Sequence, residues 1–195
     1  MTDFKHRAQA RHDAAIEANP WLEPKKLQRL TSRIQVENAS LKTRRQKLVL
    51  VADRFNAALA PHVACKPGCA GCCSMTTMIY AHEAEAMAQA SGRAMASVPV
   101  RPFNVALNEA RRFHGIPCPF QHENRCSIYA ARPLICRIHH SLNDDASACD
   151  TSVPFEERKP VASYDVDRIE LPYHCLMTEN GTKEAWGAIQ EFFPG

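Results

Sequence analysis

The segment CKPGCAGCC, residues 65–73, places four cysteines within nine residues, and the last two are adjacent. Thiolates are preferred ligands of zinc and of iron–sulfur clusters, because sulfur is a soft donor that carries negative charge. The two-residue spacer between Cys69 and Cys72 lets both sulfurs reach one metal. Gly68 and Gly71 suit the positive backbone dihedrals that such a turn requires. The segment therefore predicts a metal site.

A second group of cysteines, further along the chain, enlarges the set of candidate ligands. The seven predicted metal ligands are Cys65, Cys69, Cys72, Cys73, Cys118, Cys126 and Cys136. A structural zinc or a 4Fe–4S cluster needs only four. Since adjacent cysteines rarely bind one mononuclear ion together, three interpretations stay open: two metal sites, one site with spare thiols, or a multinuclear cluster.

The remaining cysteines and histidines are weaker candidates for metal ligands. Cys149 and Cys175 lie outside both groups, and an isolated cysteine often serves as a small buried hydrophobic residue. His139, His140 and His174 lie beside cysteines and could each add an imidazole ligand. With nine histidines in the chain, each of the three is more often a surface or core residue than a ligand.

The composition limits the classes of protein to which the chain can belong. The chain has 195 residues, of which 45% are hydrophobic and 23% charged, as in globular domains. It contains no apolar run near the roughly 18 residues that a membrane span needs. The first 21 residues are charged and lack the apolar core of a secretory signal. We therefore expect a cytoplasmic protein with no membrane partner, whose reduced thiols favour metal binding over disulfides.

Positive charge is concentrated at the amino-terminal end. Residues 1–54 hold 12 Lys and Arg against 6 Asp and Glu, whereas the whole chain has a net charge of only +3. Aromatic residues are not interleaved with these basic residues, which argues against a nucleic-acid partner. The simpler interpretation is a solvated helix face, and an acidic protein surface is the alternative partner.

The first third of the chain has the periodicity of helices. One helix is expected over residues 3–18 and a second over residues 24–60. Apolar residues recur along the second at Leu27, Ile34, Leu41, Leu48 and Phe55, with Leu30, Ala52 and Leu59 beside them. Such a stripe indicates packing within the chain, and a homodimer through the 24–60 helix is the alternative.

Short elements are expected after residue 63. The pattern predicts a strand within residues 74–80, helices over 82–92, 102–113 and 182–193, and a helical turn interrupted by Pro133. Residues 141–160 have the composition of a loop. The predicted fold is mostly α, with long amino-terminal helices packed on an irregular, metal-stapled cysteine-rich core with short helices. Its predicted domains are a helical arm, 1–63, and a cysteine-rich metal-binding domain, 64–195.

The motifs CKPGCAGCC, CPF and CSIYAARPLICR together resemble the CxxCxxCC (YkgJ-like) family of zinc- or iron-chelating proteins. The matching positions are the seven cysteines, Glu83, Pro119, Ile128, Tyr129, Arg132, Pro133 and Arg137. The resemblance covers about residues 64–140. It implies a bound metal, either Zn²⁺ or an iron–sulfur cluster. In one departure, three residues instead of two separate Cys65 from Cys69.

Two arginines of the last motif suit an anionic metal site. Several thiolates on one divalent ion leave net negative charge, which a guanidinium offsets while donating hydrogen bonds to sulfur. Arg137 and Arg132 are therefore predicted to be cofactor-binding residues, and for Arg132 pairing with a surface carboxylate is the alternative. Glu83 has the position of a residue that begins a helix, and this position by itself explains it.

Three functions compete on these grounds. The leading one is a metal-binding protein or metal carrier, with an iron–sulfur cluster favoured over zinc because of the adjacent cysteines and the surplus of sulfur. A structural-metal interaction module without catalytic activity, with a protein partner, is the second. The third is an iron–sulfur enzyme of unknown reaction. No glycine-rich strand-to-helix turn that would bind a nucleotide is present in the sequence.

Overall fold

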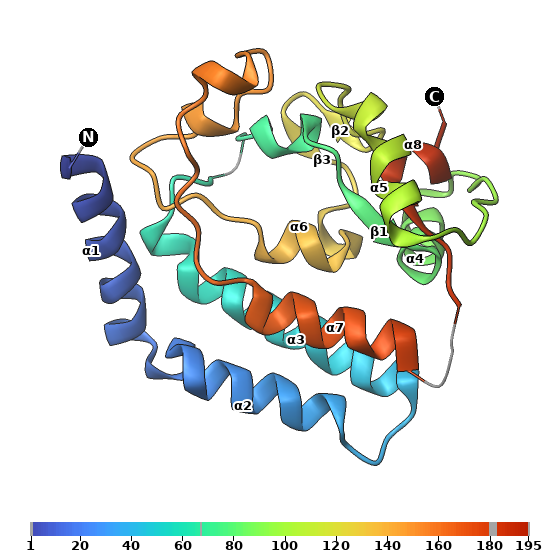
Figure 1. The fold of residues 1–195 in the computed structure, drawn as a ribbon, viewed down its shortest axis with the longest axis horizontal. Coiled ribbons are helices and arrows are strands. Elements are labelled where there is room, and N and C mark those ends of the chain that lie inside the picture. The colour runs from blue at the N-terminus through green and yellow to red at the C-terminus, as the bar shows by residue number, and fades with distance from the viewer. Residues whose placement is uncertain (1, 67, 180–182, 195) are drawn as a thin grey trace. The chain divides into compact units, whose positions relative to one another are not determined.

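Helices dominate the computed structural model, which is 58% helical. The prediction of a mostly α fold is therefore confirmed (Figure 1). The structure describes residues 2–66, 68–179 and 183–194.

The chain divides by its internal contacts into two compact units that interleave along the sequence. The first unit comprises Met1–Lys66, Arg137–Ala146 and Pro160–Thr182, and the second comprises Pro67–Cys136, Ser147–Lys159 and Lys183–Gly195. The predicted domains 1–63 and 64–195 remain a prediction, because units defined by contacts need not coincide with domains that fold alone.

The first unit is built from helices. Its elements are α1 (Thr2–Ala18), η1 (Pro20–Leu22), α2 (Pro24–Gln35), α3 (Leu41–Leu59), η2 (Ala60–His62) and α7 (Asp167–Thr178). Both α2 and α3 pack against α7, as Figure 1 shows. Arg7 and Arg11 of α1 form ion pairs with Asp144, which tie this helix to the 137–146 segment of the same unit.

The single helix predicted over residues 24–60 is wrong, because the chain turns between α2 and α3. Ser40 begins α3 as its N-cap, and its hydroxyl oxygen accepts a hydrogen bond at 3.1 Å from the amide of Thr43. A serine in this position satisfies an amide at the helix start that would otherwise lack a partner. The heptad spacing of apolar residues therefore continues across a break in the helix.

The apolar stripe is buried within the first unit, as its packing interpretation predicted. Leu27, Leu48 and Phe55 have no exposed surface, and Ile34 is 8% exposed. The Phe55 ring lies edge-on to that of Tyr164, with the ring centres 5.3 Å apart. The homodimer through residues 24–60 stays a prediction.

Helix α7 was not predicted, because Pro172 lies in its middle. Proline has no amide hydrogen, so the carbonyl of Arg168, four residues earlier, loses its helical hydrogen bond. The buried hydroxyl of Thr31 on α2 donates a hydrogen bond to this carbonyl at 2.7 Å. A neighbouring helix thus replaces the hydrogen bond that the proline removes.

Replacing Thr31 with valine tests this compensation. We expect Thr31→Val to lower the free energy of unfolding by about 1–3 kcal/mol, because it leaves a buried carbonyl without a donor. Thr31→Ser keeps the hydroxyl and should cost less. In a Pro172→Ala background the helix regains its own amide, so Thr31→Val should be better tolerated. Urea denaturation of the wild type and the four variants measures these losses, and equal losses from Thr31→Val in both backgrounds would contradict the explanation.

The second unit has short helices around two small antiparallel pairs of strands. Its strands are β1 (Met78–Tyr80), paired with β4 (Trp186–Ala188), and β2 (Gln121–His122), paired with β3 (Arg125–Cys126). Its helical elements are η3 (Gly71–Ser74), α4 (Ala81–Ser91), α5 (Phe103–Ala110), η4 (Arg111–Phe113), η5 (Tyr129–Ala131), η6 (Ser147–Cys149), η7 (Phe155–Glu157) and α8 (Ile189–Phe192). Helix α6 (Leu134–Ile138) crosses the boundary between the units.

The hydrophobic core of the second unit lies between α4, α8 and the β1–β4 pair. Its buried members are Ile79, Ala84, Met87, Phe120, Ile128, Ala185, Ile189, Phe192 and Phe193. Cys118 and Cys126 pack against this core while half-buried. Two predicted ligands are therefore held beside the best-packed part of the unit.

The helix predicted over residues 182–193 is wrong over most of its length. Residues 186–188 form β4, and only Ile189–Phe192 are helical, whereas Thr182 lies outside the described residues. A Cβ at Gly187 would lie 2.7 Å from a carboxylate oxygen of Glu191 and 3.2 Å from Val98. Glycine permits this close approach, and pairing with β1 overrides the local helical pattern.

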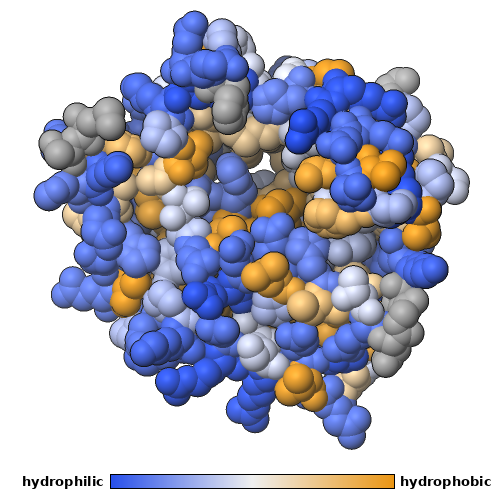
Figure 2. Space-filling model, in the orientation of Figure 1, coloured by the Kyte–Doolittle hydropathy of each residue, from blue (hydrophilic) through white to orange (hydrophobic). Residues whose placement is uncertain are grey.

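Within the described ranges, no helix is both long and apolar enough to cross a bilayer. On the face that Figure 2 presents, most residues are hydrophilic and hydrophobic residues occur in small groups.

Candidate metal centre

The cysteine-rich turn depends on glycine at two positions, for different reasons. Gly68 has a φ of 88°, in the left-handed region that favours glycine, as predicted. Gly71 instead permits a close approach: a Cβ there would lie 2.9 Å from the Cβ of Cys149 and 3.0 Å from its carbonyl oxygen. The positive dihedral predicted for Gly71 is thus replaced by a packing requirement.

Cys149 consequently belongs to the neighbourhood of this turn. It is buried, 3% exposed, at the end of η6, which packs on η3. The sequence treated it as an isolated core cysteine, and no motif signalled its proximity to Cys72. The close approach to Gly71 places a further sulfur-bearing residue beside the CAGCC turn.

Backbone hydrogen bonds join the two cysteine groups. The amide of Cys118 donates to the carbonyl of Cys73 at 2.7 Å, and the amide of Gly115 donates to the carbonyl of Ser74 at 2.8 Å. Segments separated by more than 40 residues thereby lie side by side within the second unit. The convergence of these two groups of cysteines was the central expectation from the sequence.

A tight hairpin brings Cys126 to the same region. Strands β2 and β3 pair Gln121 with Cys126, and the two turn residues, Glu123 and Asn124, have φ of 48° and 59°. Positive φ at both positions matches the right-handed twist of a two-residue hairpin. The sequence pattern did not predict this hairpin, because glutamate seldom occupies such a position.

Glu83 links the beginnings of two helices. One carboxylate oxygen accepts from the amide of Tyr80 at 3.0 Å, next to the start of α4, and the other accepts from the amide of Leu134 at 2.9 Å, at the start of α6. Because α6 carries Cys136, Glu83 positions a predicted ligand. Its role therefore exceeds the beginning of its own helix, which was all that its sequence position explained.

Replacing Glu83 with alanine tests this positioning. We expect Glu83→Ala to speed hydrogen exchange at the amides of Tyr80 and Leu134 at least tenfold, because charge-assisted hydrogen bonds contribute about 1.5–3 kcal/mol. Glu85→Ala is the matched control, since Glu85 is exposed in the first two turns of the same helix. Equal exchange in the two variants would contradict the link between α4 and α6.

The thiols influence one another's ionisation. Burial is the main cause of the raised pKa of Cys136, and charge on the thiols of Cys72, Cys118 and Cys126 raises it further. Burial also raises the pKa of Cys118, to which charge on Cys126 and Cys72 adds. The pKa of Cys72 is raised first by its contact with the Cys73 thiol and then by burial. Four chain segments therefore contribute thiols to one electrostatic neighbourhood.

Cys136 is exposed as a residue, although protein surrounds its thiol. The residue reaches solvent, yet enough protein lies around its thiol to disfavour the thiolate. A carboxylate, Glu83, adds to the same effect. At neutral pH the thiols of Cys72, Cys118 and Cys136 accordingly keep their protons.

The two predicted arginines have different surroundings. Arg132 is 7% exposed, its guanidinium lies 3.7 Å above the centre of the Tyr129 ring, and its charge lowers the pKa of Cys72. Arg137 belongs to the first unit, where it forms an ion pair with Asp53 on α3. Arg132 therefore lies close enough to offset charge on the Cys72 thiol, whereas Arg137 pairs with a carboxylate on α3. The roles of both arginines beside a cofactor stay predictions.

The other predicted sulfurs and imidazoles are distributed over both units. Cys65 belongs to the first unit, next to Ala64, whose amide donates to the carbonyl of Ser141 at 2.8 Å. Cys69 is a half-buried free thiol of the second unit. His140 is buried in the first unit, where its ring nitrogens contact the carbonyl of Ile138 and the side chain of Asn56.

The donors have the chemistry of a zinc or iron site. Cys69, Cys72, Cys73, Cys118, Cys126 and Cys136 are all free thiols, and thiolates bind both metals. Among the described residues, no three His, Cys, Asp or Glu side chains are arranged as ligands of a single ion. Thiolates are the ligands of either metal, so metal binding requires deprotonation of the thiols that serve as ligands.

Comparison with known proteins identifies one family. A family model named CxxCxxCC, described as a "Putative zinc- or iron-chelating domain", matches residues 64–169, more than half of the chain. The match extends beyond the motifs of residues 64–140. No curated protein and no solved structure matches the chain. The family description supports metal binding, and the chain belongs to the CxxCxxCC family.

Proposed function

We propose that this chain is a cytoplasmic metal-binding protein that holds an iron–sulfur cluster or zinc through clustered cysteines. The proposed ligands are drawn from Cys65, Cys69, Cys72, Cys73, Cys118, Cys126 and Cys136. The observation that carries the proposal is that the pKa values of Cys118 and Cys136 are raised, first by burial and then by charge on the thiols of Cys72 and Cys126. Ionisable groups whose pKa values are shifted by burial and by close neighbours are typical of a functional site.

An iron–sulfur cluster accounts better than zinc for the number and spacing of the sulfurs. One zinc ion needs four thiolates at about 2.3 Å, which the adjacent pair Cys72–Cys73 cannot readily supply together. A cluster has several iron atoms, so its ligands are further apart. Arg132, close enough to lower the pKa of Cys72, would offset the negative charge of either centre.

Anaerobic purification of the full chain, followed by absorption spectroscopy and metal analysis, tests this choice. The expected result is a brown protein that contains iron and acid-labile sulfide in equal amounts. A colourless protein with stoichiometric zinc would replace the iron–sulfur cluster with a zinc site. A chain that retains neither metal under these conditions would refute the proposed function.

A carrier role is favoured by the exposure of Cys136. A metal transferred to a partner protein must be reached by the partner's ligands, and an exposed thiol gives them a point of entry. We therefore expect a chromogenic chelator to remove the metal without unfolding the chain. Cys136→Ser should speed this loss, because one ligand fewer holds the metal.

A structural role is favoured by the shortness of the elements that carry the cysteines. Element η3 has 4 residues, β3 has 2 and α6 has 5, and such elements are not stable alone. A metal would then stabilise the second unit and leave it to bind a protein partner. Metal loss that requires global unfolding, as measured by matching rates of release and unfolding, would favour this role over the carrier.

A further inference from the structure

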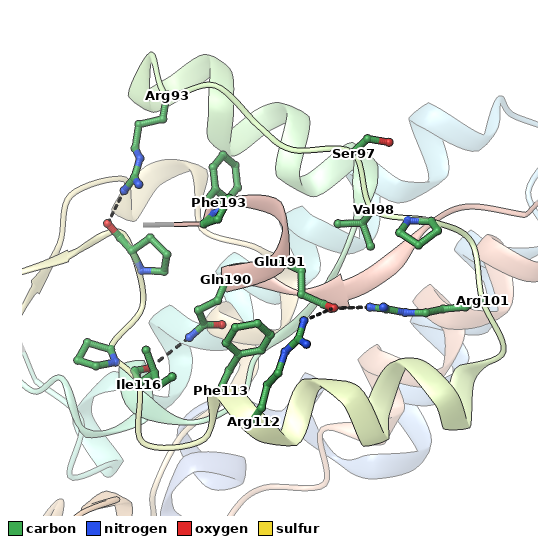
Figure 3. Close-up of a pocket in the computed structure, with 14 residues that line it drawn as sticks. Arg93, Ser97, Val98, Arg101, Arg112, Phe113, Ile116, Gln190, Glu191 and Phe193 are labelled. Carbon is green, nitrogen blue, oxygen red and sulfur yellow. Dashed lines mark hydrogen bonds and ion pairs between the residues drawn. The ribbon is translucent and has the colours of Figure 1, made fainter.

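A pocket of about 820 Å³ opens in the second unit. Its walls come from the segment after α4, from η4 and the loop that follows it, and from α8 (Figure 3). None of the nine cysteines lines it. The volume lies in the range of pockets that hold small molecules.

The pocket carries net positive charge. Arg93, Arg101 and Arg112 line it together with one acidic residue, Glu191. Figure 3 shows the Glu191 carboxylate between the guanidinium groups of Arg101 and Arg112. Arg101 donates to both carboxylate oxygens of Glu191, at 2.7 and 2.6 Å, and also forms an ion pair with Glu109.

Glu191 also stabilises the start of α8. Its side chain is 6% exposed, and one carboxylate oxygen accepts from the amide of Ala188 at 2.9 Å, before the start of α8. The distance from Glu191 to Arg112 is 3.5 Å, longer than an ordinary charge-assisted hydrogen bond. Arg112 therefore keeps most of its hydrogen-bonding capacity for another anion.

Arg93 and Arg112 are held at the pocket by aromatic rings. The guanidinium carbon of Arg112 lies 4.8 Å from the centre of the Phe113 ring, and that of Arg93 lies 5.3 Å from the centre of the Phe120 ring. One nitrogen of Arg93 also donates to the carbonyl of Pro119 at 2.8 Å. A guanidinium has five N–H donors, so these contacts leave donors available to an anion.

The remaining walls are mainly apolar. They include Val98, Phe113, Ile116 and Phe193, with several prolines. Gln190 fixes one wall by donating from its side-chain amide to the carbonyl of Ile116 at 3.2 Å (Figure 3). A ligand here would place apolar atoms against these side chains while its charge reaches the arginines.

We propose that this pocket binds a small organic anion, with one carboxylate or phosphate group and an aromatic or branched apolar body. Arg112 binds the anionic group, and Phe113 and Ile116 contact the apolar body. Arg101 and Glu191, which pair with each other, line the adjoining wall. None of the nine cysteines lines this site, although Pro117 and Pro119, on either side of Cys118, do.

Equilibrium dialysis of the full metal-loaded chain against three probes tests the proposal. The anion 2-naphthoate has both required parts, 2-naphthamide lacks the charge, and acetate lacks the apolar body. We expect 2-naphthoate to bind one per chain, and 2-naphthamide and acetate to bind at least tenfold more weakly. Added salt should weaken 2-naphthoate binding, because it screens the charged contact.

Matched arginine variants locate the site. Arg112→Gln should weaken 2-naphthoate binding about fivefold or more, a size typical of a charge-assisted contact. Arg111→Gln removes the same charge from the neighbouring residue of η4, which does not line the pocket, and should change binding less than twofold. Arg111 and Arg112 are exposed residues, so both variants should fold.

Three outcomes would overturn the proposal. They are no binding of 2-naphthoate at millimolar concentration, equal binding of 2-naphthoate and 2-naphthamide, or an equal effect of Arg111→Gln and Arg112→Gln. Metal content is measured on the same samples. Loss of the metal with intact 2-naphthoate binding, or the reverse, separates this pocket from the proposed metal function.

Discussion

Cys118→Ser is expected to weaken zinc binding at least about a hundredfold, the largest effect of any substitution considered for this chain. Cys118 lies at the junction of the two cysteine groups, because its amide donates to the carbonyl of Cys73. Serine keeps this backbone contact and nearly the same side-chain volume. The loss therefore reports on the sulfur as a ligand. Competition with a zinc chelator of known affinity measures it.

Cys175→Ser is the matched control for this prediction. Cys175 is an exposed free thiol on α7, a helix of the first unit. Its replacement removes one sulfur in the same way and should leave the zinc affinity unchanged. Hydrogen exchange after zinc removal should rise within residues 68–136 and stay constant in α2 and α7. Equal affinities for the Cys118 and Cys175 variants would contradict the proposed ligand set.

Zinc affinity is also expected to rise steeply with pH. The pKa values of Cys72, Cys118 and Cys136 are all raised, so these thiols are protonated in the metal-free protein at neutral pH. Zinc binds thiolates, so each of the three must lose its proton. Release of three protons makes the apparent affinity rise about a thousandfold per pH unit below the thiol pKa values.

Chelator competition at several pH values, with proton release measured in weakly buffered solution, checks this slope. Cys118→Ser should lower the slope by about one proton, and Cys175→Ser should leave it unchanged. A slope near zero would mean that the thiols are already ionised, or that they are not the ligands. Either outcome would contradict the site.

The same shifts determine how the metal-free protein responds to alkali. An unfolded thiol ionises near pH 8.5, whereas these three thiols keep their protons to higher pH in the folded state. Above about pH 8.5 the folded state therefore binds more protons than the unfolded state. The stabilisation is fully present below that pH and is lost as the pH rises through the folded pKa values.

Local patterns predicted much of the fold. The amphipathic periodicity of α2 and α3 and the capping of α4 by Gly92, with φ of 70°, are signals contained within a few turns of chain. The break before Ser40 was missed because a heptad pattern can continue across a turn. Helix α7 was missed because its proline is tolerated only through a hydrogen bond from Thr31, on another helix.

The candidate site, like the fold, was predicted from the sequence only in part. The motifs identified the residues with metal-ligand chemistry, because thiol spacing and the glycine at position 68 are local properties. They could not show that Glu83 begins two helices at once, or that Cys149 packs against Gly71. These contacts depend on segments far apart in the sequence.

By itself the sequence determined the class of helical fold, the family and the sulfur-rich composition of the centre. The tertiary structure alone decided which thiols lie together, that residues 186–188 form a strand, and that three arginines line one pocket. The physical reason is the distance along the chain over which each kind of interaction acts. Helical periodicity and turn preferences act between neighbouring residues, whereas strand pairing, close backbone approach and shared electrostatic fields arise only after distant segments have packed together.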